Sequence, residues 1–360
     1  MISYIGPQFT IRQWVTSLVN YRKNSQNLGK DLAKDGNLIL KIKQRYVLYE
    51  IIKKLNLNET YILLPTYTCH SLLEVIKETK NKPLFYSVKD FTVDGNEIHK
   101  YIKKYNISIM IVSDVFGIKV AVPSGLYSED IIFIGDFAHH INFIHKDDER
   151  KFDVAMYSSS FYKPMISNGI GIGIVLNQKK VNIDSVSILK NNFFSVLGSF
   201  SRLFLIQLLL NSNFLKFFIN DKKENSSIIF DVKECKKIPS VYDFSLLFNY
   251  KLNERKILNH LSRKRQRMTE KYKNLSFLRL YAEEEKSTYF NVLVKNKKRF
   301  QAYLLNKKIF TGSVFTDYAG KEYVENTDAK QLSDAVINLP FINEHDEEYI
   351  YNVIRKYKNV

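Results

Sequence analysis

The chain has 360 residues, of which 45% are hydrophobic and 25% charged, so it has room for two domains with a sizeable core and is not disordered by composition. Its formal net charge of +17 would suit a nucleic acid, an anionic lipid or a phosphorylated small molecule, although a lysine-rich composition alone can produce it. No apolar run is long enough for a membrane span, no signal-peptide pattern is visible, and two cysteines are too few for a disulfide framework or a zinc finger, so we expect a cytoplasmic protein.

Residues 1–235 are expected to form a large α/β domain. Apolar residues at helical spacing predict helices over 45–55, 71–79 and 96–105. Strands that alternate with helices predict a largely parallel sheet. Six short runs lack polar alternation, as is typical of strands in a sheet covered on both faces, and they span 61–64, 83–88, 107–113, 131–135, 154–158 and 170–176.

Residues 193–219 are the most apolar stretch of the chain. Arg202 and scattered serine and asparagine residues argue against a membrane span. We expect helices that pack on the core or on a partner subunit, followed by a polar loop over 221–227. The alternative is an amphipathic patch that makes a peripheral contact with a membrane surface.

Residues 236–360 are expected to form a smaller C-terminal α+β domain. The pattern predicts a long basic helix over 249–274, a strand over 288–294, and helices over 299–306 and 345–357. Much of the net positive charge falls in 251–308, but no helix-turn-helix, zinc or RNP motif accompanies it. We therefore expect no nucleic-acid partner.

Two polar residues follow strands of the predicted large sheet. Asp136 ends the run 131–135, and in open α/β sheets ligands lie beyond the carboxyl ends of strands. Lys163 follows serines in a partly apolar turn, where a lysine can lose its proton as Schiff-base chemistry requires, and those serines can hold a phosphate. Taken alone, Asp136 is more typical of an acid that caps a turn, and Lys163 is more typical of an exposed surface lysine. Together they suit pyridoxal phosphate, which needs a lysine and an acid beside its ring nitrogen.

The chain resembles the DegT/StrS-type nucleotide-sugar aminotransferases, which are pyridoxal-phosphate enzymes with the aspartate-aminotransferase fold (fold type I). Six segments carry the resemblance in the family's order and along most of the chain: 64–69 (LPTYTC), 82–94 (KPLFYSVKDFTVD), 111–117 (IVSDVFG), 135–140 (GDFAHH), 157–164 (YSSSFYKP) and 337–357 (INLPFINEHDEEYIYNVIRKY). The resemblance implies a large cofactor-binding domain and a small C-terminal domain. It also implies a homodimer with active sites at its interface.

Carried over by position, the resemblance implies a role for each matching residue. Lys163 would bind the cofactor aldehyde and shuttle a proton between substrate and cofactor. Asp136 would bind the pyridine nitrogen, His139 would lie near the phenolic oxygen, and Ser158 would bind the phosphate. His139 and His140 are adjacent on an extended chain and point to opposite sides, so we expect no metal site from the pair.

Two segments depart from the family pattern. The family has a small Gly-, Ser- or Thr-rich turn where backbone N–H groups meet the phosphate, whereas this chain has Gln44 and Arg45 within Lys43–Tyr46. Gln44 and Arg45 are both expected to bind the cofactor at this point, and Arg45 could bind its phosphate directly. Cys69 aligns with the family's aromatic residue over the cofactor ring, with Tyr67 or His70 as the other candidates for stacking. Both departures lie at positions that contact the cofactor in the family, so they concern cofactor affinity and catalytic activity more than the fold.

The leading interpretation is an aminotransferase that moves an amino group from an amino acid, by resemblance glutamate, to a keto-sugar nucleotide in polysaccharide or surface-glycan biosynthesis. The family's sugar dehydratase branch has histidine at the position of Lys163, so the lysine argues against that reading. The departures at residues 43–46 and Cys69 keep open a catalytically impaired member that acts as a binding or assembly subunit.

Overall fold

The computed structural model describes most of the chain. The described residues are 11–128, 130–143, 150–160, 163–165, 167–184, 193–211, 230–281, 288–309, 311–312, 318–325, 327–340 and 344–357. Within them, no helix is both long and apolar enough to cross a membrane.

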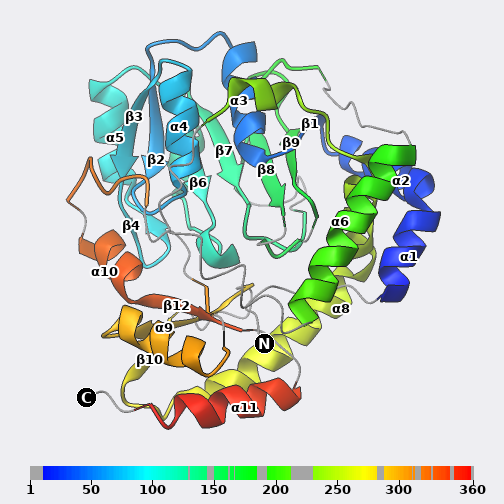
Figure 1. The fold of residues 1–360 in the computed structure, drawn as a ribbon. Helices are drawn as coiled ribbons and strands as arrows, with labels where there is room; N and C mark the ends of the chain where they lie inside the picture. The colour runs from blue at the N-terminus through cyan, green and yellow to red at the C-terminus, as the bar shows by residue number, and fades with distance from the viewer. Residues whose placement is uncertain are drawn as a thin grey trace.

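A seven-stranded sheet forms the centre of the larger part of the molecule (Figure 1). All of its strands run parallel to one another except β9, which is antiparallel to both of its neighbours, β1 and β8. This mostly parallel sheet confirms the predicted α/β fold class. In spatial order the strands are β1 (Asn37–Lys41), β9 (Ile170–Val175), β8 (Val154–Ser159), β7 (Ile132–Asp136), β6 (Ile107–Ser113), β2 (Tyr61–Pro65) and β3 (Lys82–Tyr86).

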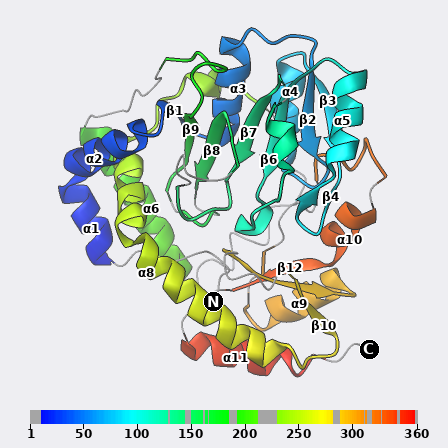
Figure 2. The same ribbon diagram turned by 180° about the vertical axis from the view of Figure 1, so that it is seen from behind.

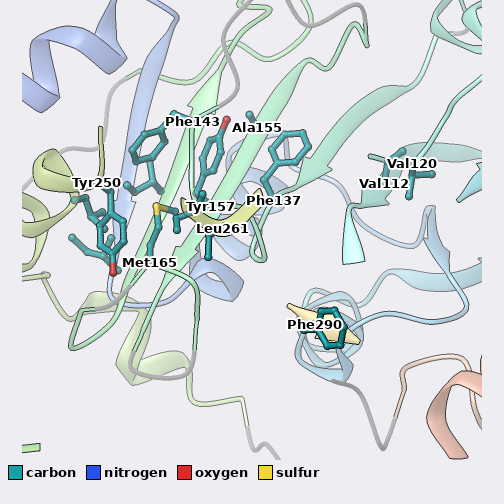
Figure 3. Packing of buried hydrophobic residues seen from close by; sticks show 14 of the residues in the cluster. Val112, Val120, Phe137, Phe143, Ala155, Tyr157, Met165, Tyr250, Leu261 and Phe290 are labelled. Carbon is teal, nitrogen blue, oxygen red and sulfur yellow. The ribbon is translucent and has the colours of Figure 1, made fainter. Parts of the chain in front are cut away.

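The sheet is covered on both faces, as the unbroken apolar runs predicted. Successive side chains of β6 enter different cores, because strand side chains alternate between faces. Met110 and Val112 join the larger hydrophobic cluster, whereas Ile109 and Ile111 join the one beneath α3 and α4. Figure 3 shows part of the larger cluster, where Phe137 and Tyr157 pack with their ring centroids 5.5 Å apart.

The helices beside this sheet follow the predicted spacing within one or two residues. They are α3 (Gln44–Lys54), α4 (His70–Glu78) and α5 (Gly95–Lys104). Val47, Leu48, Ile51 and Ile52 bury one face of α3 against the sheet. A hairpin of β4 (Val88–Lys89) and β5 (Thr92–Val93) precedes α5.

Four helices lie along one side of the sheet (Figures 1 and 2). They are α1 (Ile11–Val19), α2 (Tyr21–Ala33), α6 (Phe193–Asn211) and α8 (Val241–Tyr272). The apolar stretch therefore begins as a helix, and α6 packs on α8 and α1. Val196 and Leu203 are buried, but Phe194 is 82% exposed. The rest of the predicted helical segment, 212–219, and the predicted loop, 221–227, lie outside the described residues.

A second, antiparallel sheet lies at the other end of α8 (Figure 2). Its strand order is β10 (Leu278–Tyr281), β11 (Phe290–Val294) and β12 (Val336–Leu339), accompanied by α9 (Lys297–Asn306), α10 (Thr327–Ala335) and α11 (Glu344–Ile354). The start of α8 packs against α2, and α8 also contacts β10 and α11. This long helix thus links the two sheets, and the expected domain boundary near residue 235 stays a prediction.

Candidate active site

A cavity of about 410 Å³ opens at the carboxyl ends of β6, β7 and β8. This is where open α/β sheets place their ligands. Seven of the residues singled out from the sequence line this one cavity, although they come from separate parts of the chain. They are Gln44, Arg45, Cys69, Asp136, His139, Ser158 and Lys163.

Asp136 is the last residue of β7 and is held by three hydrogen bonds. Its Oδ1 accepts from Gln44 Nε2 at 2.6 Å and from the backbone N–H of Ala138 at 3.1 Å. Its Oδ2 accepts from the Ser113 hydroxyl at 3.1 Å. The carboxylate is buried, so these donors fix its orientation at the cavity wall.

Lys163 lies in the turn that follows β8, partly buried, with its backbone N–H donating to the Ser160 carbonyl at 3.1 Å. Burial lowers the pKa of its amine, and the nearby Cys69 and Asp136 act in the opposite direction. The neutral, nucleophilic form of the amine is therefore more populated than in an exposed lysine. A lysine in this state is suited to attack a carbonyl carbon.

His139 is fixed as a neutral imidazole. Burial, followed by the positive charge of Lys163 and by His140, lowers its pKa well below the ordinary histidine value. Its Nδ1 accepts a hydrogen bond from the backbone N–H of Phe116 at 3.1 Å, so the ring proton belongs on Nε2. Phe116 has a left-handed backbone, with φ of 63°.

His140 turns to a different partner, although the two histidines do not lie on the extended chain that was expected but in a turn closed by the His140 N–H to the Phe137 carbonyl at 3.1 Å. Its Nε2 lies 3.0 Å from Asp114 Oδ2. Asp114 also accepts from the Arg150 guanidinium, at 2.8 Å to each oxygen. This buried ion pair joins the end of β6 to Arg150, and the two histidines have separate hydrogen-bond partners.

The N-terminus of α3 faces the cavity with Lys43, Gln44 and Arg45. The N-cap residue, Lys43, makes no side-chain capping hydrogen bond at this helix end, which carries a partial positive charge. Arg45 Nε is buried there without a hydrogen-bond partner in the described structure. An uncapped helix start beside an unsatisfied guanidinium nitrogen fits a phosphate group, and together with Lys163 and Asp136 it fits pyridoxal phosphate.

Gly171 of β9 explains how α3 comes so close. A Cβ on this residue would lie 2.3 Å from the Lys43 carbonyl carbon and 2.4 Å from the Gln44 nitrogen. The missing side chain therefore lets the first turn of α3 rest directly on the sheet. As a result, Gln44 does not point to the phosphate end, but reaches across to Asp136.

Cys69 lies at the start of α4 on the cavity wall, with its Sγ 3.0 Å from Ser71 Oγ. The two aromatic candidates for stacking lie elsewhere. Tyr67 is buried against Tyr318, with ring centroids 5.9 Å apart, and His70 pairs with Glu74 at 3.0 Å. Neither lines the cavity.

The sequence did not predict that Asp243, on α8, supports the cavity wall through hydrogen bonds. Asp243 accepts from the backbone N–H of Asn168 at 3.0 Å, from its amide at 3.2 Å and from the Ser199 hydroxyl of α6 at 3.1 Å. Asn168 lines the cavity. Burial raises the pKa of Asp243 to about 6. The one signal in the sequence that could have identified Asp243 is its position among the apolar residues at the start of α8.

Solved structures with the same fold cover nearly the whole chain. Helicobacter pylori PseC, an aminotransferase involved in the biosynthesis of pseudoaminic acid, has a TM-score of 0.70 and 13% identity, and the match covers 99% of this chain and 98% of that one. Spr1654 of Streptococcus pneumoniae, described as a sugar aminotransferase and solved in its PMP form, has a TM-score of 0.68 and 14% identity, with 99% and 98% coverage. A DegT DnrJ EryC1 StrS aminotransferase of Brucella abortus has a TM-score of 0.66 and 13% identity, with 97% and 96% coverage.

No protein-family model matches the sequence, and no curated protein matches it. At 13–14% identity the three structures show the fold alone. The fold that the six motif segments implied, that of the DegT-type aminotransferases, is thereby confirmed.

Proposed function

We propose that this protein is a pyridoxal-phosphate-dependent aminotransferase that moves an amino group from an amino acid, expected to be glutamate, to a keto-sugar nucleotide. The observation that carries the proposal is the meeting of Lys163, Asp136 and the cationic start of α3 around one cavity. The sugar aminotransferases among the structures of the same fold support the substrate class. A role in polysaccharide or surface-glycan biosynthesis follows from that class.

Each end of the cofactor has a matching group. Asp136 would receive the protonated ring nitrogen, while Arg45, Ser158 and the N-terminus of α3 would hold the phosphate. Lys163 would bind the aldehyde carbon of the cofactor. When bound, pyridoxal phosphate supplies an electron sink for cleavage of a carbon–hydrogen bond.

The chain's own residues then handle the proton. Lys163 Nζ, with its lowered pKa, can accept a proton at neutral pH and return it to a neighbouring carbon. His139 keeps its Nε2 proton as a hydrogen-bond donor without adding charge to the cavity. Asp136 stays in a single orientation because three donors hold it.

Two other interpretations compete with this one. A sugar dehydratase of the same family would have histidine in place of Lys163, so the lysine speaks against it. A catalytically impaired binding or assembly subunit was suggested by Cys69 and by the glycine-free turn at residues 43–46. The Arg45 guanidinium lies 5.4 Å from the centroid of the Tyr46 ring, but its Nε has no hydrogen-bond partner among the described residues, which supports phosphate binding at that turn in spite of the missing glycine.

Spectroscopy on the purified protein tests the proposal. With pyridoxal phosphate the protein should turn yellow, and added glutamate should bleach or shift the band. Keto-sugar nucleotides should then restore it, and mass spectrometry should detect the aminated product. A yellow protein that no amino donor changes, or a colourless one, would contradict the aminotransferase and favour the binding-subunit interpretation.

A further inference from the structure

Gln44 is buried within the cavity wall and uses both hydrogens of its amide. Its side chain is 8% exposed. Nε2 donates to Asp136 Oδ1 at 2.6 Å and to the Met156 carbonyl of β8 at 3.2 Å. With both donors committed to the sheet, the amide has no hydrogen left for a ligand phosphate.

The acceptor positions of Asp136 are filled unequally. An ionised carboxylate offers about two acceptor directions on each oxygen. Oδ1 has both filled, by Gln44 and by the backbone N–H of Ala138. Oδ2 accepts from Ser113 alone among the described residues, and Ser113 lies 3.0 Å from the Thr68 hydroxyl. One acceptor direction of Oδ2 is thus left on a carboxylate that lines the cavity.

Gln44 reaches Asp136 across 92 positions of sequence, from a helix start to the end of a strand. The contact exists because Gly171 lets the first turn of α3 rest on β9, beside β8 and β7. The glutamine side chain is long enough for its amide to span the remaining distance to the Asp136 carboxylate. A shorter residue at position 44 would leave Oδ1 with one donor fewer and the carboxylate freer to rotate.

We propose that Gln44 is a positioning residue that fixes the Asp136 carboxylate so that Oδ2 faces the ring nitrogen of the cofactor. This inference rests on the proposed function, and it replaces the direct cofactor contact expected for Gln44 with a role that acts on Asp136. Gln44 acts through Asp136. Its removal should therefore weaken recognition of the ring nitrogen specifically, and leave the phosphate and aldehyde contacts in place.

The test compares pyridoxal phosphate with its 1-deaza analogue, in which a C–H group replaces the ring nitrogen. Calorimetric titration of the wild type should show a preference for pyridoxal phosphate of at least about tenfold, since a charged partner shifts a pKa by about 1–3 units. Gln44→Met keeps the side-chain length but removes both donors. It should reduce the preference to within about threefold, while affinity for the deaza analogue changes little.

Further variants separate positioning from structure. Asp136→Asn should lose the preference as well, and the double variant Gln44→Met/Asp136→Asn should lose no more than Asp136→Asn alone. Lys53→Met is the matched control, because Lys53 is exposed at the far end of the same helix, α3, and does not line the cavity. It should keep the wild-type preference. Gln44→Ala gives a second removal of the donors if the methionine variant does not fold.

The outcomes are distinct. A Gln44→Met protein that keeps the full preference for pyridoxal phosphate would overturn the positioning role. Equal weakening of both ligands would also overturn it, because that pattern marks a structural effect. If the folded wild type binds neither ligand, the proposed function itself fails, and the inference fails with it.

Discussion

Lys163 is the residue on which the proposed chemistry depends most directly. Its amine has a pKa lowered by burial, so it becomes neutral at a lower pH than an exposed lysine. Borohydride reduction in the presence of pyridoxal phosphate at neutral pH should therefore attach the pyridoxyl group to Lys163, as peptide mapping would show. Lys179, which is exposed and does not line the cavity, offers an internal comparison and should stay unlabelled. Labelling spread evenly over exposed lysines would contradict the assignment.

Substitution of Arg45 tests whether the cofactor phosphate binds at the start of α3. Its Nε is buried without a hydrogen-bond partner in the described part of the chain, so a phosphate would complete its hydrogen bonding. Arg45→Met should weaken binding of pyridoxal phosphate by about 10- to 100-fold, since a hydrogen bond to a charged group contributes about 1.5–3 kcal/mol. Absorbance titration would measure this.

Pyridoxal, which lacks the phosphate, serves as the control ligand for Arg45. Its affinity should be nearly the same in the wild type and in Arg45→Met. Arg45→Lys should recover only part of the loss, because an ammonium group cannot form two parallel bonds to phosphate oxygens. Equal affinity of wild type and Arg45→Met for pyridoxal phosphate would remove Arg45 from the site.

At the scale of elements, Asp243 ties α8 and α6 to the Asn168 segment of the cavity. Its pKa is raised from 3.8 to about 6 by burial. Because the folded state holds this proton more tightly than the unfolded state, the group's contribution to stability is full below about pH 4 and is lost as pH rises through about 6.

Replacement of the acid by its amide should remove that pH dependence. Between about pH 4 and pH 7, the free energy of unfolding of Asp243→Asn should gain about 2.4 kcal/mol relative to wild type, at about 1.4 kcal/mol per unit of pKa shift. Urea unfolding at a series of pH values measures it. Ser199→Ala keeps the carboxyl group but removes a hydrogen bond that lowers its pKa, so the pH-dependent loss of stability should persist and extend to higher pH. Parallel profiles for Asp243→Asn and wild type would contradict the assignment.

At the scale of the whole molecule, the resemblance implies a homodimer, and α6 offers apolar surface that a partner could cover. Phe194, Leu197 and Leu205 are exposed on this helix. Light scattering should give a mass near twice 42.3 kDa. A monomer at working concentration would contradict the dimer. Flotation with liposomes, resistant to salt, would instead favour the peripheral membrane contact considered for residues 193–219.

Much of the fold could be predicted from local pattern. The run 107–113 forms β6 with the predicted bounds, because a buried strand needs only a short β-branched apolar sequence. The helix expected over 45–55 forms as α3, since its apolar residues recur on one face. Asp136 and Lys163 line the same cavity because parallel strands end at the same edge of the sheet.

The sequence by itself therefore determined the fold class, the family resemblance and the residue types of the site. Only the tertiary structure decided which of these residues touch. The pairing of β1 with β9 joins Asn37 to Val175, and the contact of Gln44 with Asp136 spans 92 positions. Such contacts leave no periodicity in the sequence, because they depend on how closely two backbones approach. That approach was set at a glycine, Gly171, whose missing side chain no local pattern could identify as the space for a helix.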